Sequence, residues 1–178
     1  MDMQMIVAGF GGQGVLLMGQ LMAYAGMLNG QEVSWMPSYG PEMRGGSANC
    51  SVVISDEPVG SPKIDEADVV IAMNKPSMAL FEKSVAKGGI LLYNSSLIDA
   101  APTRADIRVI PVPCNEIADE LGNAKVANMV MLGAVLKVTK PFDKELLVEA
   151  LRHKLGERKA KLIPLNREAM EKGMAAVK

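Results

Sequence analysis

The residues best suited to bind a ligand lie in a glycine-rich turn near the N-terminus, Gly9-Phe10-Gly11-Gly12-Gln13-Gly14. A strand is predicted before the turn, over 3–8, and a helix after it, over 15–28. Glycines let the backbone approach a phosphate, and a helix N-terminus offers unpaired N–H groups at the positive end of its dipole. The candidate cofactor-binding residues are therefore Gly9, Gly11, Gly12, Gln13 and Gly14.

The spacing G-x-G-x-x-G also occurs in dinucleotide-binding proteins, but such a site has a second requirement. An acid at the end of the second strand holds the ribose hydroxyls of NAD. Here that strand ends Trp35-Met36-Pro37-Ser38, and Glu32 precedes it, so NAD binding is disfavoured. Two interpretations stay open. The glycines only permit a tight turn and close helix–strand packing, or the turn contacts a phosphate-bearing ligand held mainly by another subunit.

A second segment, 37–49, combines prolines, glycines and a Glu/Arg pair in one predicted loop. Prolines and glycines at several positions restrict the backbone and give such a loop a fixed shape. Tyrosine and arginine are frequent interface anchors, and Arg44 can pair with a carboxylate or phosphate through two hydrogen bonds. We predict a partner-facing loop made of Ser38, Tyr39, Gly40, Pro41, Glu42, Arg44, Gly45, Gly46 and Asn49. The alternative is a solvent-facing turn with a weak Glu42–Arg44 ion pair.

The other reactive side chains do not form a pattern typical of catalysis. Cys50 and Cys114 lie far apart without a CxxC motif, which excludes a cysteine-ligated iron–sulfur cluster within this chain alone. His153, the single histidine, falls in a charged helical stretch and is expected to be solvated. Lys75 is expected to be a solvated lysine at a helix start. We therefore predict no catalytic residue and no metal ligand.

These segments must be positioned by alternating strands and helices. Strands are predicted over 3–8, 33–36, 48–55, 69–73, 90–93 and 107–112. Helices are predicted over 15–28, 76–86, 116–121 and 124–138, followed by an amphipathic helix capped by Asp143 and a last helix capped by Asn166. This order predicts an α/β fold, a three-layer α/β/α domain with a Rossmann-like start. The short link between strands 33–36 and 48–55 favours an antiparallel pair, so the sheet should be mixed but mostly parallel.

Composition limits the class of protein further. The 178 residues are 49% hydrophobic and 22% charged, which fits one globular domain over 1–178. The net charge of −1, without a basic stripe, gives no reason to expect nucleic acid as a partner. The longest apolar run, 129–136, is too short to span a bilayer, and the first residues lack the basic region of a signal peptide. We expect a cytoplasmic protein that does not bind membranes.

Four motifs in one order carry a family resemblance. GFGGQGV at 9–15, SYGPEMRGGSANC at 38–50, GSP at 60–62 and AMNKPS at 72–77 resemble the gamma subunit of 2-oxoacid:ferredoxin oxidoreductases, the pyruvate/ketoisovalerate oxidoreductase gamma family. The C-terminal helices fit in length but carry no diagnostic motif. The stretch SYGPEMRGG at 38–46 is similar to that of enzymes of the 2-oxoglutarate and branched-chain types. 2-Oxoglutarate is therefore the first substrate expected for the complex, and 2-oxoisovalerate or pyruvate are the alternatives.

The resemblance implies a fold like domain III of pyruvate:ferredoxin oxidoreductase and a role within a complex. The family decarboxylates a 2-oxoacid on thiamine diphosphate, sends electrons through iron–sulfur clusters to ferredoxin, and passes the acyl group to coenzyme A. The resemblance places thiamine diphosphate and Mg²⁺ on alpha and beta subunits, and the clusters on beta or a ferredoxin-like delta subunit. This chain is then expected to bind no cofactor alone, to be inactive alone, and to face its partner subunits with the glycine turn and the 37–49 loop. A separate possibility is that the N–H groups near 11–14 contact coenzyme A phosphates. A stand-alone Rossmann-like nucleotide-binding protein is the alternative from another class, and a pure scaffold subunit is the third.

Overall fold

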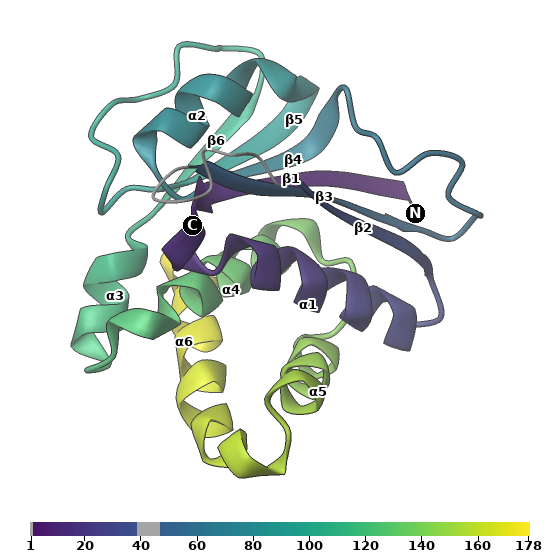
Figure 1. The fold of residues 1–178 in the computed structure, drawn as a ribbon. Helices are drawn as coiled ribbons and strands as arrows, with labels where there is room; N and C mark the ends of the chain where they lie inside the picture. The colour runs from purple at the N-terminus through teal and green to yellow at the C-terminus, as the bar shows by residue number, and fades with distance from the viewer. Residues whose placement is uncertain (1, 39–46) are drawn as a thin grey trace.

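The computed structural model describes residues 2–38 and 47–178. Figure 1 shows its helices and strands along the chain. The strands are β1 (Asp2–Phe10), β2 (Glu32–Ser38), β3 (Ser47–Ser55), β4 (Ala67–Ala72), β5 (Val85–Asn94) and β6 (Arg108–Val112). The α-helices are α1 (Val15–Leu28), α2 (Lys75–Phe81), α3 (Cys114–Glu120), α4 (Ala127–Thr139), α5 (Lys144–Leu155) and α6 (Ile163–Ala176). Short 3-10 turns are η1 (Gly11–Gln13), η3 (Glu82–Ser84), η4 (Ala124–Val126) and η5 (Glu157–Leu162).

The six strands form one mixed sheet in the order β2-β3-β1-β4-β5-β6. The strands β1, β4, β5 and β6 are all parallel to one another. Strand β3 is antiparallel to both of its neighbours, β1 and β2. This confirms the predicted α/β fold and the predicted antiparallel pair. The loop expected over 37–49 is wrong at its ends, because Pro37 pairs with Cys50 and Ser38 pairs with Asn49 within the sheet. An edge strand tolerates Pro37, since one side of the strand needs no ladder hydrogen bonds.

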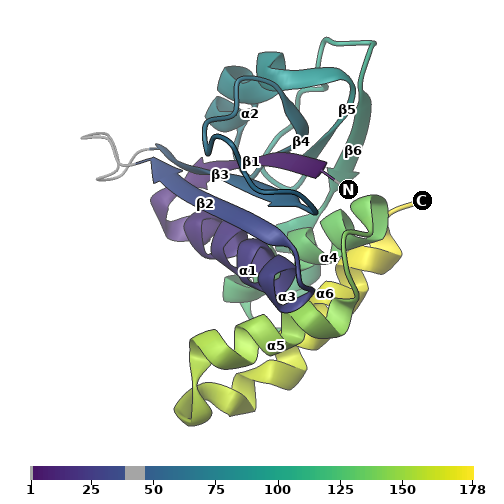
Figure 2. The same ribbon diagram turned by 90° about the vertical axis from the view of Figure 1, so that its right-hand side faces the viewer.

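The helices cover the two faces of the sheet unequally. α2 lies on one face, and α1, α3, α4, α5 and α6 lie on the other (Figures 1 and 2). Met5 and Val7 of β1 join the larger core under the five helices, while Ile6 joins the smaller core under α2. Both faces of the central strands are thus buried, which explains their continuous apolar sequence. No helix in the described ranges is long and apolar enough to cross a membrane.

α1 lies close to the sheet because two of its glycines face the strands. A Cβ at Gly19 would come within 2.4 Å of Cys50 Sγ, and one at Gly26 within 3.0 Å of Val33 Cγ1. The helix is apolar nearly all round because the sheet covers one side, and α5 and α4 contact the other. Its predicted bounds, 15–28, are confirmed.

Two predicted helix boundaries are wrong for identifiable reasons. The helix expected over 76–86 ends at Phe81, and Val85 already pairs with Ala67 in the sheet, so the strand expected from Ile90 begins earlier. The last helix begins at Ile163, with Pro164 in its first turn. Asn166 therefore sits inside the helix, where its Nδ2 donates to Leu162 O at 2.8 Å. The predicted cap Asp143 is confirmed, since its Oδ1 accepts from Glu145 N at 2.8 Å.

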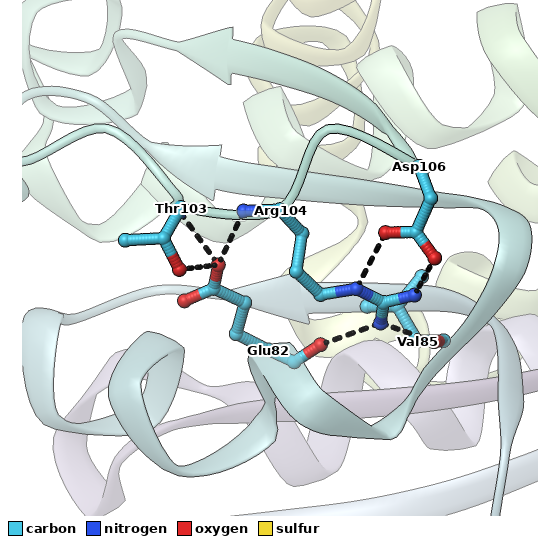
Figure 3. Close-up of polar contacts among 5 residues, drawn as sticks. All are labelled: Glu82, Val85, Thr103, Arg104 and Asp106. Carbon is cyan, nitrogen blue, oxygen red and sulfur yellow. Dashed lines mark hydrogen bonds and ion pairs between the residues drawn. The ribbon is translucent and has the colours of Figure 1, made fainter.

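The segment between β5 and β6 is held by hydrogen bonds of Arg104 (Figure 3). Its guanidinium donates to the carbonyls of Glu82 and Val85 at 3.2 and 2.5 Å, and to both carboxylate oxygens of Asp106 at 2.8 and 2.5 Å. The hydrogen bond from Arg104 lowers the pKa of Asp106, so the pair stays ionised under mildly acidic conditions. Ser96, in the same segment, accepts through Oγ from Asn115 N and Glu116 N at the start of α3. The segment therefore positions α3.

α4 and α6 cross with their backbones in direct contact. A Cβ added at Gly133 would lie 1.9 Å from Met170 O, and one added at Gly173 would lie 1.8 Å from Val130 O. A backbone carbonyl cannot rotate away as a side chain can, so the two helices would have to separate. The crossing thus requires glycine at both positions.

We expect Gly133→Ala to lower the free energy of unfolding by about 2 kcal/mol or more, the cost of overpacking against a rigid neighbour. Thermal unfolding followed by circular dichroism measures this. Gly60→Ala is the matched control, because no atom lies within 4 Å of its added Cβ and its φ is not positive. Equal melting temperatures for the two variants would show that the helices separate at no cost.

We expect Arg104→Gln to loosen the segment 95–107, because the shorter neutral amide cannot reach both carbonyls and Asp106 together. Hydrogen–deuterium exchange of the amides in this segment should become faster than in the parent protein. Arg158→Gln, at an exposed position of η5, is the control and should leave the exchange unchanged. Unaltered exchange in both variants would mean that the contacts of Arg104 do not order the segment.

Candidate functional site

Four parallel strands bring their carboxyl ends to one edge of the sheet. β1, β4, β5 and β6 end there at Phe10, Ala72, Asn94 and Val112. The helices that follow the neighbouring strands β1 and β4, α1 and α2, lie on opposite faces (Figure 1). Where the connections after two adjacent strands go to opposite faces of the sheet, a crevice opens between them. This topological switch point is the usual ligand position in open α/β sheets.

A pocket of about 420 Å³ lies at this edge, and we call it the switch-point pocket. The glycine turn, the end of β4, and the beginnings of α3 and α4 surround it. Among the described residues that line it there is a lysine but no carboxylate. They are Gly12, Gln13, Gly14, Met73, Asn115, Ala124, Lys125, Ala127 and Asn128.

Gln13 ties the glycine turn to the end of β4. Its Oε1 accepts from Phe10 N at 2.7 Å, and its Nε2 donates to Met73 O at 3.1 Å. Met73 N in turn donates to Ala8 O at 2.9 Å. The side chain predicted to contact a cofactor is thus already engaged at both ends, and it fixes the shape of the turn beside the pocket.

The glycines of the turn have different roles. Gly14 takes a left-handed conformation with φ of 72°, and a Cβ there would lie 2.7 Å from Asn128 Nδ2. A Cβ at Gly9 would come within 2.9 Å of atoms of Gln13, Val15 and Met73. A Cβ at Gly12 would have no atom within 4 Å, and this residue lines the open pocket. Gly9 and Gly14 are required for packing, while ligand binding by the turn stays a prediction.

Asn128 lies beside the glycine turn in the first turn of α4. It is 8% exposed, and none of the hydrogen bonds among the described residues involves its side chain. Among the described residues, the fully buried side-chain N and O atoms without a partner are Trp35 Nε1 and Asn74 Nδ2, so the amide of Asn128 is open to the pocket and can bind a ligand. It lines the pocket together with Lys125, where the N-termini of α1 and α4 meet. Two positive helix dipole ends, the Asn128 amide and one ammonium group make the pocket suited to an anion.

Another asparagine, Asn94, lies behind the pocket at the end of β5. It is fully buried, and its Nδ2 donates to Met73 O at 3.4 Å and to Asn115 Oδ1 at 2.7 Å. Asn94, Asn115, Lys125 and Asn128 were not predicted from the sequence. The sequence did contain features that could have indicated these residues. Asn94 and Asn115 follow predicted strands, and Asn128 is polar within an almost wholly apolar helix.

The ends of the predicted partner-facing loop lie at the same edge. Ser38 pairs with Asn49, and Asn49 pairs with Ala8 of β1, directly before the glycine turn. Tyr39, Gly40, Pro41, Glu42, Arg44, Gly45 and Gly46 lie outside the described residues. The fold thus brings the two segments singled out in the sequence onto adjacent strands, and the contacts of the loop with a partner stay a prediction.

The remaining reactive side chains lie in settings that do not suit catalysis. Burial raises the pKa of the Cys50 thiol to about 12 and raises the pKa of Cys114 as well, so both stay protonated and poorly nucleophilic. His153 is exposed and stacks on Tyr24 with ring centroids 4.8 Å apart. Lys75 forms an exposed ion pair with Asp99 at 3.1 Å. Within 2–38 and 47–178, no three His, Cys, Asp or Glu side chains gather as metal ligands.

Known proteins resemble this chain along nearly its whole length. Ketoisovalerate oxidoreductase subunit VorA of Methanothermobacter thermautotrophicus is 43% identical over 173 residues, which is 97% of this chain and 36% of VorA. The chain therefore spans about a third of the length of that relative. 2-Oxoglutarate synthase subunit KorC of Methanocaldococcus jannaschii is 35% identical over 149 residues, 82% of this chain and 79% of KorC.

Solved structures share the fold. The gamma subunit of a keto/oxoacid ferredoxin oxidoreductase from Geobacter sulfurreducens has a TM-score of 0.84 at 29% identity, covering 98% of this chain and 97% of that one. The 2-oxoglutarate:ferredoxin oxidoreductase of Magnetococcus marinus, solved with 2-oxoglutarate, coenzyme A and succinyl-CoA, has a TM-score of 0.89 at 28% identity over 98% of this chain and 31% of its own. Residues 4–176 match the family described as pyruvate ferredoxin/flavodoxin oxidoreductase. The chain thus belongs to the pyruvate ferredoxin/flavodoxin oxidoreductase family.

Proposed function

We propose that this chain is the gamma-type subunit of a thiamine diphosphate-dependent 2-oxoacid:ferredoxin oxidoreductase, and that its switch-point pocket holds a phosphate group of coenzyme A. The carrying observation is the amide of Asn128, which has no hydrogen-bond partner among the described residues and lines a pocket whose described lining has no carboxylate. Family membership and the gamma-subunit structure of Geobacter sulfurreducens support the subunit assignment. The stand-alone nucleotide-binding protein is disfavoured, since the VorA and KorC relatives and the Geobacter sulfurreducens structure are all subunits.

The residues of the pocket fit a phosphate. Asn128 of α4 and Lys125 of the preceding η4 turn would donate to it, and the backbone near Gly12 can approach it because no side chain intervenes. Coenzyme A supplies the thiol that accepts the acyl group. A pocket of about 420 Å³ encloses only part of so large a molecule, so the rest would lie against partner subunits.

We assign the redox and thiamine chemistry to partner chains. Cys50 and Cys114 are both buried, with raised pKa values, which does not suit iron–sulfur ligation. Thiamine diphosphate, Mg²⁺ and the clusters would therefore sit on alpha, beta and delta-type subunits in a cytoplasmic complex that reduces ferredoxin. This chain would contribute the coenzyme A pocket and, through its predicted loop, contacts with partner subunits.

Two observations point to different 2-oxoacids. The stretch at 38–46 resembles 2-oxoglutarate and branched-chain enzymes, with 2-oxoglutarate as the first expectation. The identity of 43% to a ketoisovalerate oxidoreductase subunit, however, exceeds the 35% to a 2-oxoglutarate synthase subunit. We propose 2-oxoisovalerate and 2-oxoglutarate as the two substrates to compare, with pyruvate as a third. The value of kcat/KM for each substrate decides between them.

We expect the purified chain alone to show no coenzyme A-dependent reduction of viologen, because its two cysteines are buried and stay protonated. Assembly with its alpha and beta partner chains should produce that activity with at least one of the proposed 2-oxoacids. Activity of the chain by itself would overturn the assignment as a non-catalytic subunit. A complex that turns over equally well without this chain would overturn its role in the reaction.

We expect Asn128→Asp to raise the KM for coenzyme A about tenfold or more in the assembled complex, because a carboxylate replaces an anion donor. Asn29→Asp adds the same charge at an exposed site at the other end of α1, and should leave KM unchanged. Lys125→Ala, at an exposed side chain, should weaken binding in the same direction without harming the fold. Parental KM values in both pocket variants would show that coenzyme A phosphates bind elsewhere.

A further inference from the structure

Asn94 is a buried amide whose orientation is set by its neighbours. Its Oδ1 accepts from Cys114 N at 3.2 Å and from Ser96 N at 3.3 Å. Backbone N–H groups only donate, so the oxygen must face them. The Nδ2 group must then face Met73 O and Asn115 Oδ1, to which it donates. Each end of the amide is thus paired with a group of the opposite kind, and the reversed orientation would lose these bonds.

This fixed orientation also orients Asn115. The short bond of 2.7 Å from Asn94 Nδ2 requires an acceptor, so Asn115 turns its Oδ1 inward. Its Nδ2 faces away from Asn94, and no hydrogen bond among the described residues uses it as a donor. Asn115 lines the switch-point pocket, at the start of α3, where Ser96 Oγ accepts from its backbone N–H at 3.2 Å.

We propose that Asn94 is a positioning residue that makes Asn115 present an N–H donor, rather than a carbonyl oxygen, to the switch-point pocket. A free amide side chain can rotate and offer either group, which suits ligand donors and acceptors alike. Held by Asn94, Asn115 selects ligand groups that accept hydrogen bonds and repels those that donate them. This inference rests on the proposed function, in which the ligand group is a phosphate.

Asn94→Asp tests the idea because it replaces the donor Nδ2 with an accepting oxygen, and the effect of the buried charge that it adds is separated by a double-mutant cycle. The aspartate still accepts from Cys114 N and Ser96 N, but its second oxygen accepts where Nδ2 donated. Asn115 must then rotate its Nδ2 inward and turn its oxygen toward the pocket. In the assembled complex, the KM and the directly titrated Kd for coenzyme A should rise about tenfold, the loss expected for a donor to a charged group. The kcat at saturating coenzyme A should change little.

A double-mutant cycle separates positioning from a general effect of the buried charge. Asn115→Ala removes the amide that Asn94 controls. If Asn94 acts through Asn115, Asn94→Asp should change the Kd for coenzyme A less than about twofold in the Asn115→Ala background. An equal tenfold loss in both backgrounds would overturn the proposal. If the aspartate variant does not assemble, Asn94→Ala, which adds no charge, replaces it in the cycle. The expected rise in the Kd for coenzyme A is then smaller.

The failure of this inference is distinguishable from failure of the proposed function. Asn128→Asp does not alter the Asn94–Asn115 pair. If it weakens coenzyme A binding while the cycle shows no coupling, the pocket binds the ligand and Asn94 does not position Asn115. If neither Asn128→Asp nor Asn115→Ala changes the Kd, the pocket is not the coenzyme A site, and both proposals are wrong.

Discussion

One carbonyl group holds the functional edge of this protein together. The oxygen of Met73, directly after β4, accepts from Gln13 Nε2 at 3.1 Å and from Asn94 Nδ2 at 3.4 Å. These donors come from the segments after β1 and at the end of β5, so the carbonyl joins three consecutive strands of the sheet at their carboxyl ends. A buried carbonyl needs a partner, and here that requirement fixes both the glycine turn and the asparagine behind the pocket.

The pocket follows from this arrangement. Gln13 holds the glycine turn through its hydrogen bond from Phe10 N, and Gly14 takes a left-handed conformation. α1 therefore begins at the crevice. Asn128, in the first turn of α4, lies next to Gly14. The described residues that line the pocket supply donors and positive dipole ends, but none of the acids, thiolates or metal ligands that most catalysis needs. Such a site can hold and orient an anionic ligand, which agrees with the proposed role as a subunit that serves chemistry on partner chains.

The sequence was sufficient where local signals and packing agreed. The bounds of α1, the cap at Asp143 and the antiparallel β2–β3 pair were predicted correctly, because apolar periodicity, capping residues and short links act locally. The helix predicted to reach residue 86 ends earlier because Val85 pairs with Ala67 in the sheet. The predicted cap Asn166 lies inside the last helix because Pro164 occupies its first turn. Asn94, Asn115 and Asn128 come together only through strand order, which short-range patterns do not encode.

Our central proposal is that this chain receives the phosphates of coenzyme A at the switch point. A crystal or cryo-electron microscopy structure of the assembled complex with coenzyme A tests it directly. We predict a phosphate group within hydrogen-bond distance of Asn128 and beside Gly12, with the Nδ2 of Asn115 facing the ligand. Coenzyme A bound with its phosphates away from α4 and the glycine turn would contradict the proposal.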